Sequence, residues 1–178
     1  FSAVGATESK YNIEQSSPNA NINLAEQELL SCSGAGTCNG GWPWTALEYE
    51  KTSGISDEAC FSYTAQNSQC SKCSGSSSRT WKITNYDFSM YNADAIKRSL
   101  ICNGPLSIAS FGWSNVGPSG HAIVLVGYDD STSKWIIKNS WGLGYAQGGE
   151  DKGYGGLSYT DTRSDFAVIL YLSGVVSP

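Results

Sequence analysis

The chain has 178 residues and a mass of 19.0 kDa, enough for one domain of ordinary size or for two small lobes. Hydrophobic residues make up 40% of the chain and charged residues 15%, a balance that excludes an intrinsically disordered protein. The net charge of −5, without any run of Lys or Arg, argues against a nucleic-acid partner. No apolar run in the sequence is long enough to span a membrane, so we expect no membrane partner either.

The cysteine content indicates an oxidising compartment. Many cysteines in a short chain, with few charges and abundant Ser and Gly, are typical of a secreted or lysosome-like protein; the alternative is a cytosolic protein with zinc or reduced thiols. The pair Cys70-x-x-Cys73 alone resembles half of a zinc site, but there is no second such pair and only one histidine. We therefore expect no metal and no cofactor. The six cysteines are Cys32, Cys38, Cys60, Cys70, Cys73 and Cys102.

The first predicted element is an amphipathic helix over residues 1–11, in which Phe1, Val4 and Tyr11 form a packed stripe. The apolar face begins at Phe1, with no capping residue and no Met before it. We expect that this helix has lost its own N-terminus: either the sequence starts late, or the chain was cut, or another segment supplies that end.

The later elements change from helical to extended patterns along the chain. Their order predicts an α+β protein with a helical lobe over residues 1–83 and a β-rich lobe over residues 84–178. We expect short helices at residues 26–30 and 43–49, a loop over 60–78, a strand over 81–86 and a helix over 92–101. Five strands are then expected, at residues 106–111, 121–128, 134–138, 154–159 and 166–172.

Two predicted strands carry residues with catalytic chemistry. The lone histidine, His121, opens one apolar strand, and Asn139 closes the next. If the two strands pair in antiparallel fashion, the amide can lie beside the imidazole and fix its tautomer and orientation, as a catalytic base requires. The alternatives are a structural histidine and an asparagine that merely ends a strand in a turn.

Five segments in the right order resemble the papain-type cysteine peptidases, and the resemblance runs the length of the chain. The segments are Phe1-Ser2-Ala3, the Glu-Gln-Glu-Leu-Leu-Ser-Cys run that ends at Cys32, the Cys-Asn-Gly-Gly-Trp-Pro run from Cys38 to Pro43, the Gly-His-Ala run with the Val-Gly-Tyr that follows it, and the Lys-Asn-Ser-Trp-Gly run around Asn139.

The resemblance implies a papain-like two-lobe fold, with a helical lobe, an antiparallel β-barrel-like lobe and an active-site cleft between them. It implies that His121 is the catalytic base of a thiolate, that Asn139 orients the imidazole and that Trp141 shields their hydrogen bond. A peptide or protein is the implied substrate, and a propeptide or a protein inhibitor is a further implied partner. The implied substrate-binding residues are Gly40, Gly41, Trp42, Pro43, Ala109 and Gly120, together with Trp141, and an apolar pocket for the second residue before the cut is part of that set.

The chain departs from the family pattern in one decisive respect, because the nucleophilic cysteine of the family would stand three residues before Phe1. The resemblance also implies that Cys32 pairs with Cys70 and that Cys38 pairs with a cysteine upstream of the nucleophile; Cys60 with Cys73 is a further candidate among the 15 connectivities that six cysteines allow. Cys102 is then left free. The span from Pro105 to His121 is short for the family, and Ala25 replaces the usual Ser cap.

We therefore expect a cysteine endopeptidase that acts through a Cys-His-Asn site when the missing N-terminal segment is present, and an inactive polypeptide when it is absent. A catalytically inactive peptide-binding pseudo-peptidase is the alternative, although retention of both His121 and Asn139 argues against it. An unrelated structural or zinc-bearing domain is a third reading, disfavoured by the shortage of ligands.

Overall fold

The computed structural model describes residues 1–18, 20–110, 120–147, 149–150, 152–162 and 166–178. Its contacts divide the chain into two compact units. We call Ala3–Tyr86 with Leu172–Pro178 the helical unit, and Phe1–Ser2 with Asp87–Tyr171 the sheet unit. The sequence placed the boundary between residues 83 and 84; in the structure the last seven residues group with the helical unit and the first two with the sheet unit. Within the described ranges, no helix is both long enough and apolar enough to cross a membrane.

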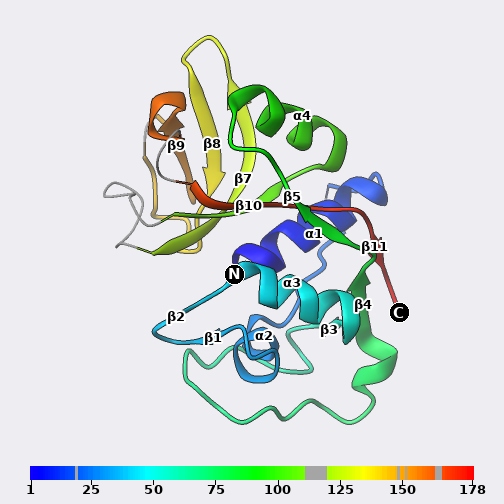
Figure 1. Cartoon of the computed structure of the whole chain (residues 1–178). Coiled ribbons are helices and arrows are strands. Elements are labelled where there is room, and N and C mark those ends of the chain that lie inside the picture. Colours follow the sequence, from blue (N-terminus) through cyan, green and yellow to red (C-terminus); the bar gives the residue numbers. More distant parts are fainter. Residues whose placement is uncertain (19, 111–119, 148, 151, 163–165) are drawn as a thin grey trace. The chain divides into compact units, whose positions relative to one another are not determined.

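The helical unit is built around three helices, α1 (Ser2–Glu14), α2 (Glu26–Cys32) and α3 (Pro43–Thr52), shown in blue to cyan in Figure 1. α3 begins at a proline, whose missing N–H is no loss in the first turn of a helix. α2 begins after Ala25, which makes no side-chain cap hydrogen bond because a methyl group has no acceptor atom. The expected core position of Phe1 is wrong: the residue is 50% exposed, whereas Val4 is fully buried.

Short strands complete this unit. β1 (Gly36–Thr37) and β2 (Gly40–Gly41) form a hairpin where the sequence indicated a Gly-rich turn. β3 (Ile55–Ser56), β4 (Thr80–Ile83) and β11 (Val175–Val176) form a three-stranded sheet in the order β11-β4-β3, which the sequence did not indicate. The 3-10 helix η1 (Ser76–Arg79) begins within the predicted loop and ends one residue after it. The two disulfides of the structure, Cys32–Cys70 and Cys60–Cys73, tie the long loop back to these elements.

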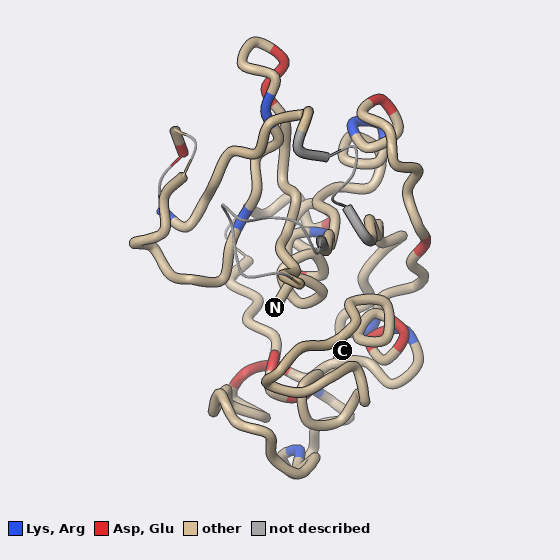
Figure 2. The backbone as a smooth tube through the Cα atoms, turned by 60° about the vertical axis from the view of Figure 1, so that its left-hand side comes forward, with Lys and Arg blue, Asp and Glu red and all other residues tan. Residues whose placement is uncertain are grey.

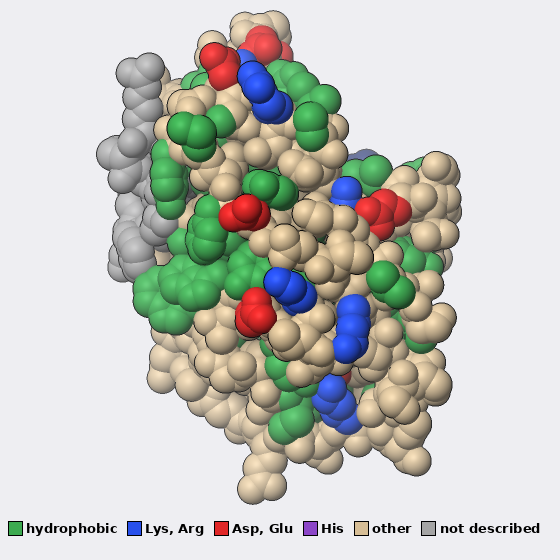
Figure 3. Space-filling model, turned by 45° about the vertical axis from the view of Figure 1, so that its right-hand side comes forward, with side chains coloured by type: hydrophobic (Ala, Val, Ile, Leu, Met, Phe, Trp, Pro, Cys, Tyr) green, Lys and Arg blue, Asp and Glu red, His purple; other side chains and the backbone are tan. Residues whose placement is uncertain are grey.

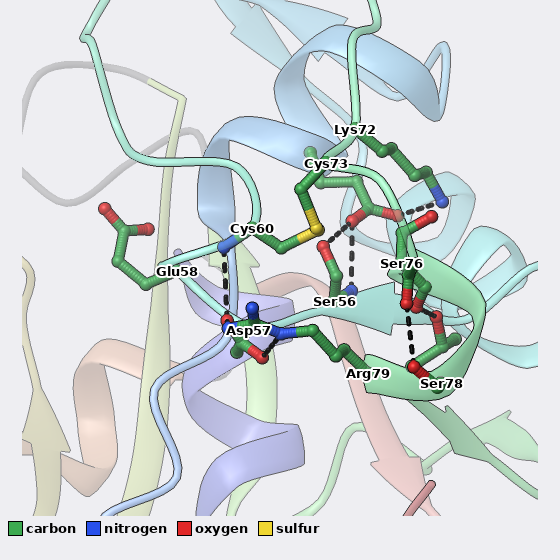
Figure 4. Close-up of a disulfide and its surroundings, with 12 residues drawn as sticks. Ser56, Asp57, Glu58, Cys60, Lys72, Cys73, Ser76, Ser78 and Arg79 are labelled. Carbon is green, nitrogen blue, oxygen red and sulfur yellow. Dashed lines mark hydrogen bonds and ion pairs between the residues drawn. A yellow bond between two sulfur atoms is a disulfide. The ribbon is translucent and has the colours of Figure 1, made fainter.

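A buried carboxylate organises the area around the second disulfide. Glu28 is fully buried and accepts hydrogen bonds from the Ser56 N–H at 3.0 Å and the Tyr49 hydroxyl at 3.0 Å, and it forms an ion pair with Lys72. Lys72 and Ser56, which both contact the Glu28 carboxylate, are labelled in Figure 4 together with Asp57 and Arg79, which form an ion pair. A buried charge is tolerated only when it is paired and hydrogen-bonded, and Glu28 meets both conditions.

The sheet unit contains most of a six-stranded sheet with the order β5-β10-β6-β7-β8-β9. The strands are β5 (Tyr86–Phe88), β6 (Leu106–Ser110), β7 (His121–Asp129), β8 (Lys134–Lys138), β9 (Tyr154–Ser158) and β10 (Phe166–Leu172). A 3-10 helix, η2 (Tyr159–Thr162), begins at Tyr159, so the predicted strand ends one residue early. The predicted strand over 81–86 is divided between β4 and β5, and Phe111, predicted to end a strand, lies outside the described residues.

Helix α4 (Ala93–Asn103) lies beside this sheet, with β7 and β8 near it in Figure 1. Its inward residue Ile96 is 1% exposed and joins a core cluster with strand residues such as Leu125 and Trp135. Ala93 and Leu100 pack against the same cluster, as their helical spacing predicted. Figure 2 shows charged residues thinly spread along the backbone, and on the face drawn in Figure 3 positive and negative side chains are interspersed.

Candidate active site

The pairing of β7 with β8 brings His121 and Asn139 together in the sheet unit. The two strands are antiparallel neighbours, with Val124 opposite Lys138. His121 is the first residue of β7, and Asn139 follows the last residue of β8 directly. Strand order and register therefore place the start of one strand beside the end of the other, as the sequence pattern predicted.

The contact between the two side chains is a hydrogen bond that joins His121 Nε2 and Asn139 Oδ1 at 3.0 Å. The same Oδ1 accepts a hydrogen bond from the Ser140 backbone N–H at 2.8 Å, so this end of the amide is the carbonyl oxygen. A carbonyl oxygen only accepts, hence Nε2 of His121 must carry a hydrogen. The other ring nitrogen, Nδ1, is then the one that gains or loses a proton.

Asn139 is held by its surroundings. Its side chain is 7% exposed, and its backbone N–H donates to the Gly153 carbonyl oxygen at 2.9 Å. Burial raises the pKa of the nearby Tyr145 hydroxyl, and Asn139 partly opposes that rise. The sequence analysis did not single out Tyr145; only its position six residues after Asn139 hinted at a contact through the intervening turn.

An aromatic ring covers the imidazole. Trp141 stacks on His121 with ring centroids 5.1 Å apart and an interplanar angle of 28°. Continuing the β7–β8 register past the end of β8 places Trp141 opposite His121, which explains the stacking. The indole is 50% exposed, so it forms the outer surface over the ring.

Two other predicted site residues lie near the start of β7: Ala109 through strand pairing, and Gly120 as the preceding residue of the chain. Ala109 of β6 is paired with Ala122, the residue that follows His121. Gly120 is exposed and directly precedes β7 with a φ of 84°, a backbone conformation that favours glycine. The sheet unit thus contains His121, Asn139, Trp141, Ala109 and Gly120.

The remaining predicted substrate-binding residues lie in the helical unit, on hairpin β1–β2 and at the start of α3. Gly41 pairs with Gly36, and a Cβ atom at Gly41 would lie 2.5 Å from the Ala35 carbonyl oxygen, so only glycine fits there. Gly40 and Gly41 are exposed. Trp42 is 48% exposed and stacks on Trp44 at 4.5 Å, whereas Pro43 is buried.

The cysteines and acidic residues offer no metal site: among the residues described, no three His, Cys, Asp or Glu side chains are grouped to hold an ion. Cys38 and Cys102 are free and exposed. The His121–Asn139 pair presents an oriented imidazole, which suits proton transfer to and from a nucleophile.

Comparison with known proteins is consistent with this chemistry. A sequence profile described as "Papain family cysteine protease" matches residues 1–164. The chain is 31% identical over 166 residues to ananain of Ananas comosus, covering 84% of this chain and 47% of the relative. It is 32% identical over 177 residues to the thiol protease aleurain of Arabidopsis thaliana, covering 86% and 47%. The chain thus spans about half the length of these curated relatives.

Solved structures resemble the fold. A cysteine protease from Carica candamarcensis, crystallised in complex with E-64, aligns with a TM-score of 0.76 at 25% identity, covering 98% of this chain and 86% of that one. A digestive procathepsin L 3 of Tenebrio molitor aligns with a TM-score of 0.77 at 26% identity, covering 97% and 62%. These likenesses, with the four α-helices and the antiparallel sheets of the described residues, confirm the predicted α+β class and papain-like fold.

Proposed function

Because this chain belongs to the papain family of cysteine proteases, we propose that it is the greater part of a thiol endopeptidase that hydrolyses peptide bonds in peptide or protein substrates. The observation that carries the proposal is the 3.0 Å hydrogen bond between His121 Nε2 and Asn139 Oδ1, covered by Trp141. A structural histidine would need no such orientation by a buried amide. In this proposal the nucleophilic cysteine stands three residues before Phe1.

The proposed reaction follows from the free Nδ1 of His121. Nδ1 takes the proton of the cysteine thiol, and the thiolate attacks the carbonyl carbon of the scissile bond. The imidazolium then gives that proton to the leaving amine as the C–N bond breaks and an acyl-enzyme forms. A water molecule, deprotonated by the same nitrogen, releases the acid and restores the thiol. Asn139 holds the ring throughout and Trp141 excludes water from their hydrogen bond.

The substrate-binding roles are part of the same proposal. Gly40 and Gly41 offer exposed backbone groups to an extended peptide, in a strand-like pairing that makes few demands on side chains. The carbonyl of Gly120 accepts from the substrate amide near the cut. Trp42, Pro43 and Ala109 are the residues proposed to contact an apolar second residue before the cut.

The setting of the enzyme follows from its disulfides. Two disulfide bonds are typical of an oxidising compartment, so we place the enzyme in a secreted or lysosome-like location. One of the solved structures with a similar fold is a procathepsin. In addition to the substrate, we propose a propeptide or a protein inhibitor as a regulatory partner.

The test uses the protein together with the segment that carries the proposed nucleophile. We expect His121→Ala to lower the rate of thiol alkylation near pH 6 by about a hundredfold, because a thiol without an imidazolium partner returns to its ordinary pKa. Asn139→Ala should lower kcat by about tenfold to a hundredfold with little change in KM, since it misorients the base and leaves binding intact. The readouts are the pH dependence of alkylation and the hydrolysis of peptide substrates.

Asn103→Ala, at the end of α4, is the matched control and should leave both rates unchanged. An alkylation rate that is the same in His121→Ala as in the wild type would contradict the proposed role of the imidazole. A wild-type protein that binds peptides but neither hydrolyses them nor reacts with a thiol trap would instead support the pseudo-peptidase alternative.

A further inference from the structure

A buried pair of serines joins the first residues of the chain to the middle of the sheet unit, to which both serines belong. The Ser107 hydroxyl on β6 donates a hydrogen bond to the Ser2 hydroxyl oxygen at 3.0 Å. Ser107 is fully buried and Ser2 is 6% exposed. A buried hydroxyl is costly unless it is hydrogen-bonded, and this contact meets that need for both side chains.

Strand β6 gives the contact a firm support. Ser107 lies opposite Val124 of β7 and Leu170 of β10, so β6 is paired on both sides at this point. Val124 is 4% exposed and Leu170 is fully buried. Buried strands that are paired on both edges open least often in a folded protein. The hydrogen bond therefore anchors Ser2 to a part of the sheet that we expect to be rigid.

The same two strands, β6 and β7, set the position of His121. In their register His121 lies opposite Ser110, three residues along β6 from Ser107. At about 3.3 Å per residue, this is a separation on the order of 10 Å along the sheet. The anchor of Ser2 and the imidazole thus depend on one pair of neighbouring strands.

The proposed nucleophile is close to this anchor in the sequence. It stands three residues before Phe1, and so four residues before Ser2. Four residues span at most about 14 Å when fully extended and about 6 Å in a helix. A hydrogen bond that holds Ser2 on β6 therefore limits where the cysteine can lie with respect to His121.

We infer that Ser2 and Ser107 are positioning residues, whose hydrogen bond holds the chain that follows the nucleophile against the strands that place His121. The inference rests on the proposed function, because it gives this bond a role in forming the thiolate. Reacting atoms must come within about 3–3.5 Å of one another, and a displacement of about 1 Å can cost a hundredfold in rate. The thiolate is stabilised only while the imidazolium stays beside it.

The test uses Ser107→Ala in the complete protein, with the segment that carries the proposed nucleophile. We expect its rate of thiol alkylation near pH 6 to fall by about three- to tenfold, the range that one hydrogen bond supplies. The rate should approach that of the wild type above about pH 9, where the thiol ionises without help from the imidazolium. In peptide hydrolysis kcat should fall by a similar factor while KM stays within about twofold, since the serines do not bind substrate.

Ser89→Ala is the matched control. Ser89 is 7% exposed, and its hydroxyl shares a 2.9 Å hydrogen bond with the Ser99 hydroxyl in the same unit. This variant therefore also loses one bond of a largely buried serine pair, and it should keep the wild-type pH profile. A profile altered equally in Ser89→Ala and Ser107→Ala would mean that a general loss of stability causes the change, and it would overturn the inference.

The partner variant, Ser2→Ala, removes the same bond from the other side and decides the question if Ser107→Ala does not fold. In the double variant the loss at pH 6 should be no larger than in the more affected single variant, because both changes remove one interaction. Losses that multiply would show that the two hydroxyls act independently, which contradicts the inference.

A readout that needs no activity separates this inference from the proposed function. In nitrogen-15 relaxation, we expect Ser107→Ala to lower the order parameter of the Ser2 N–H from about 0.85 to about 0.6, and Ser89→Ala to leave it unchanged. An active wild type with an unchanged alkylation profile in folded Ser107→Ala overturns the inference and leaves the proposed function standing. A wild type that neither hydrolyses peptides nor reacts with a thiol trap overturns the proposed function, and an unchanged order parameter overturns the anchor itself.

Discussion

A second buried carboxyl group, Glu50 on α3, has an environment very different from that of Glu28. It is fully buried, and its one hydrogen bond recorded in the described part of the chain comes to Oε2 from the Thr7 hydroxyl on α1, while Oε1 has no hydrogen-bond partner there. Burial raises the pKa of Glu50 to about 7 from an ordinary value of 4.5, and the Thr7 hydrogen bond offsets only part of that rise. Glu28, by contrast, has Lys72 as a charged partner.

The folded state therefore binds a proton at Glu50 more tightly than the unfolded state does. The raised pKa of Glu50 means that this group contributes its full stabilisation of the folded state below about pH 4.5. That contribution is lost as the pH rises through about 7. We expect the free energy of unfolding to be lower at pH 8 than at pH 5 by an amount on the order of 3 kcal/mol from this group. Glu50→Gln should remove most of that difference, as measured by urea unfolding at the two pH values.

Glu48→Gln provides the control, because Glu48 lies on the same helix with an exposed side chain. It should retain the pH dependence of the wild type. The same steep pH dependence in Glu50→Gln would show that other groups cause it.

At the scale of elements, α4 and α2 show what a cap residue contributes. Asn92 caps α4 by accepting a hydrogen bond from the Ala95 N–H at 2.9 Å, whereas Ala25 before α2 has no side chain able to do so. α2 is stabilised instead by tertiary contacts: Leu29 is buried in the core, and a disulfide joins Cys32, the last residue of α2, to Cys70. A local side-chain cap marks the start of α4, whereas tertiary contacts support α2.

We expect Asn92→Ala to lower the free energy of unfolding by about 1 kcal/mol, because one N–H in the first turn of α4 loses its acceptor. Asn92→Ser keeps an acceptor at the cap and should retain nearly the full stability. Urea unfolding monitored by circular dichroism compares the two variants, and equal stability of Asn92→Ala and the wild type would disprove the contribution of the cap.

Most elements were predictable because their periodicity is local. The apolar runs of β7 and β8 and the helical spacing of Ala93, Ile96 and Leu100 predicted strands and a helix that the structure contains. The two-residue strands were not predictable, because a pair such as Ile55–Ser56 carries no period and becomes a strand only when it meets Trp81 and Thr80.

At the scale of the whole molecule, covalent cross-links are unevenly distributed between the units. Both disulfides lie in the helical unit, and Cys102, free and exposed, is the one cysteine of the sheet unit. The cross-linked pairs are 38 and 13 residues apart, so loop-closure entropy assigns them about 4 and about 3 kcal/mol. The sheet unit depends instead on its core of strand residues.

Reduction should therefore weaken one unit before the other. In hydrogen exchange with a thiol reductant, we expect the amides of α2 and α3 to lose protection by about a hundredfold or more, while those of β7 and β8 keep theirs. Cys102→Ser is the control and should alter neither pattern. Loss of protection in β7 and β8 at the same reductant concentration would mean that the two units unfold together.

The sequence by itself determined the family, the α+β class, most helices and strands, and the candidate His121–Asn139 pair, because residue types and short-range spacing carry that information. The tertiary structure alone decided that Phe1 is half exposed, that the Glu50 carboxyl group is fully buried, and that Tyr145 meets Trp141 edge-on. Burial and hydrogen bonding of this kind depend on which distant segments pack together, and no local pattern in the chain records that packing.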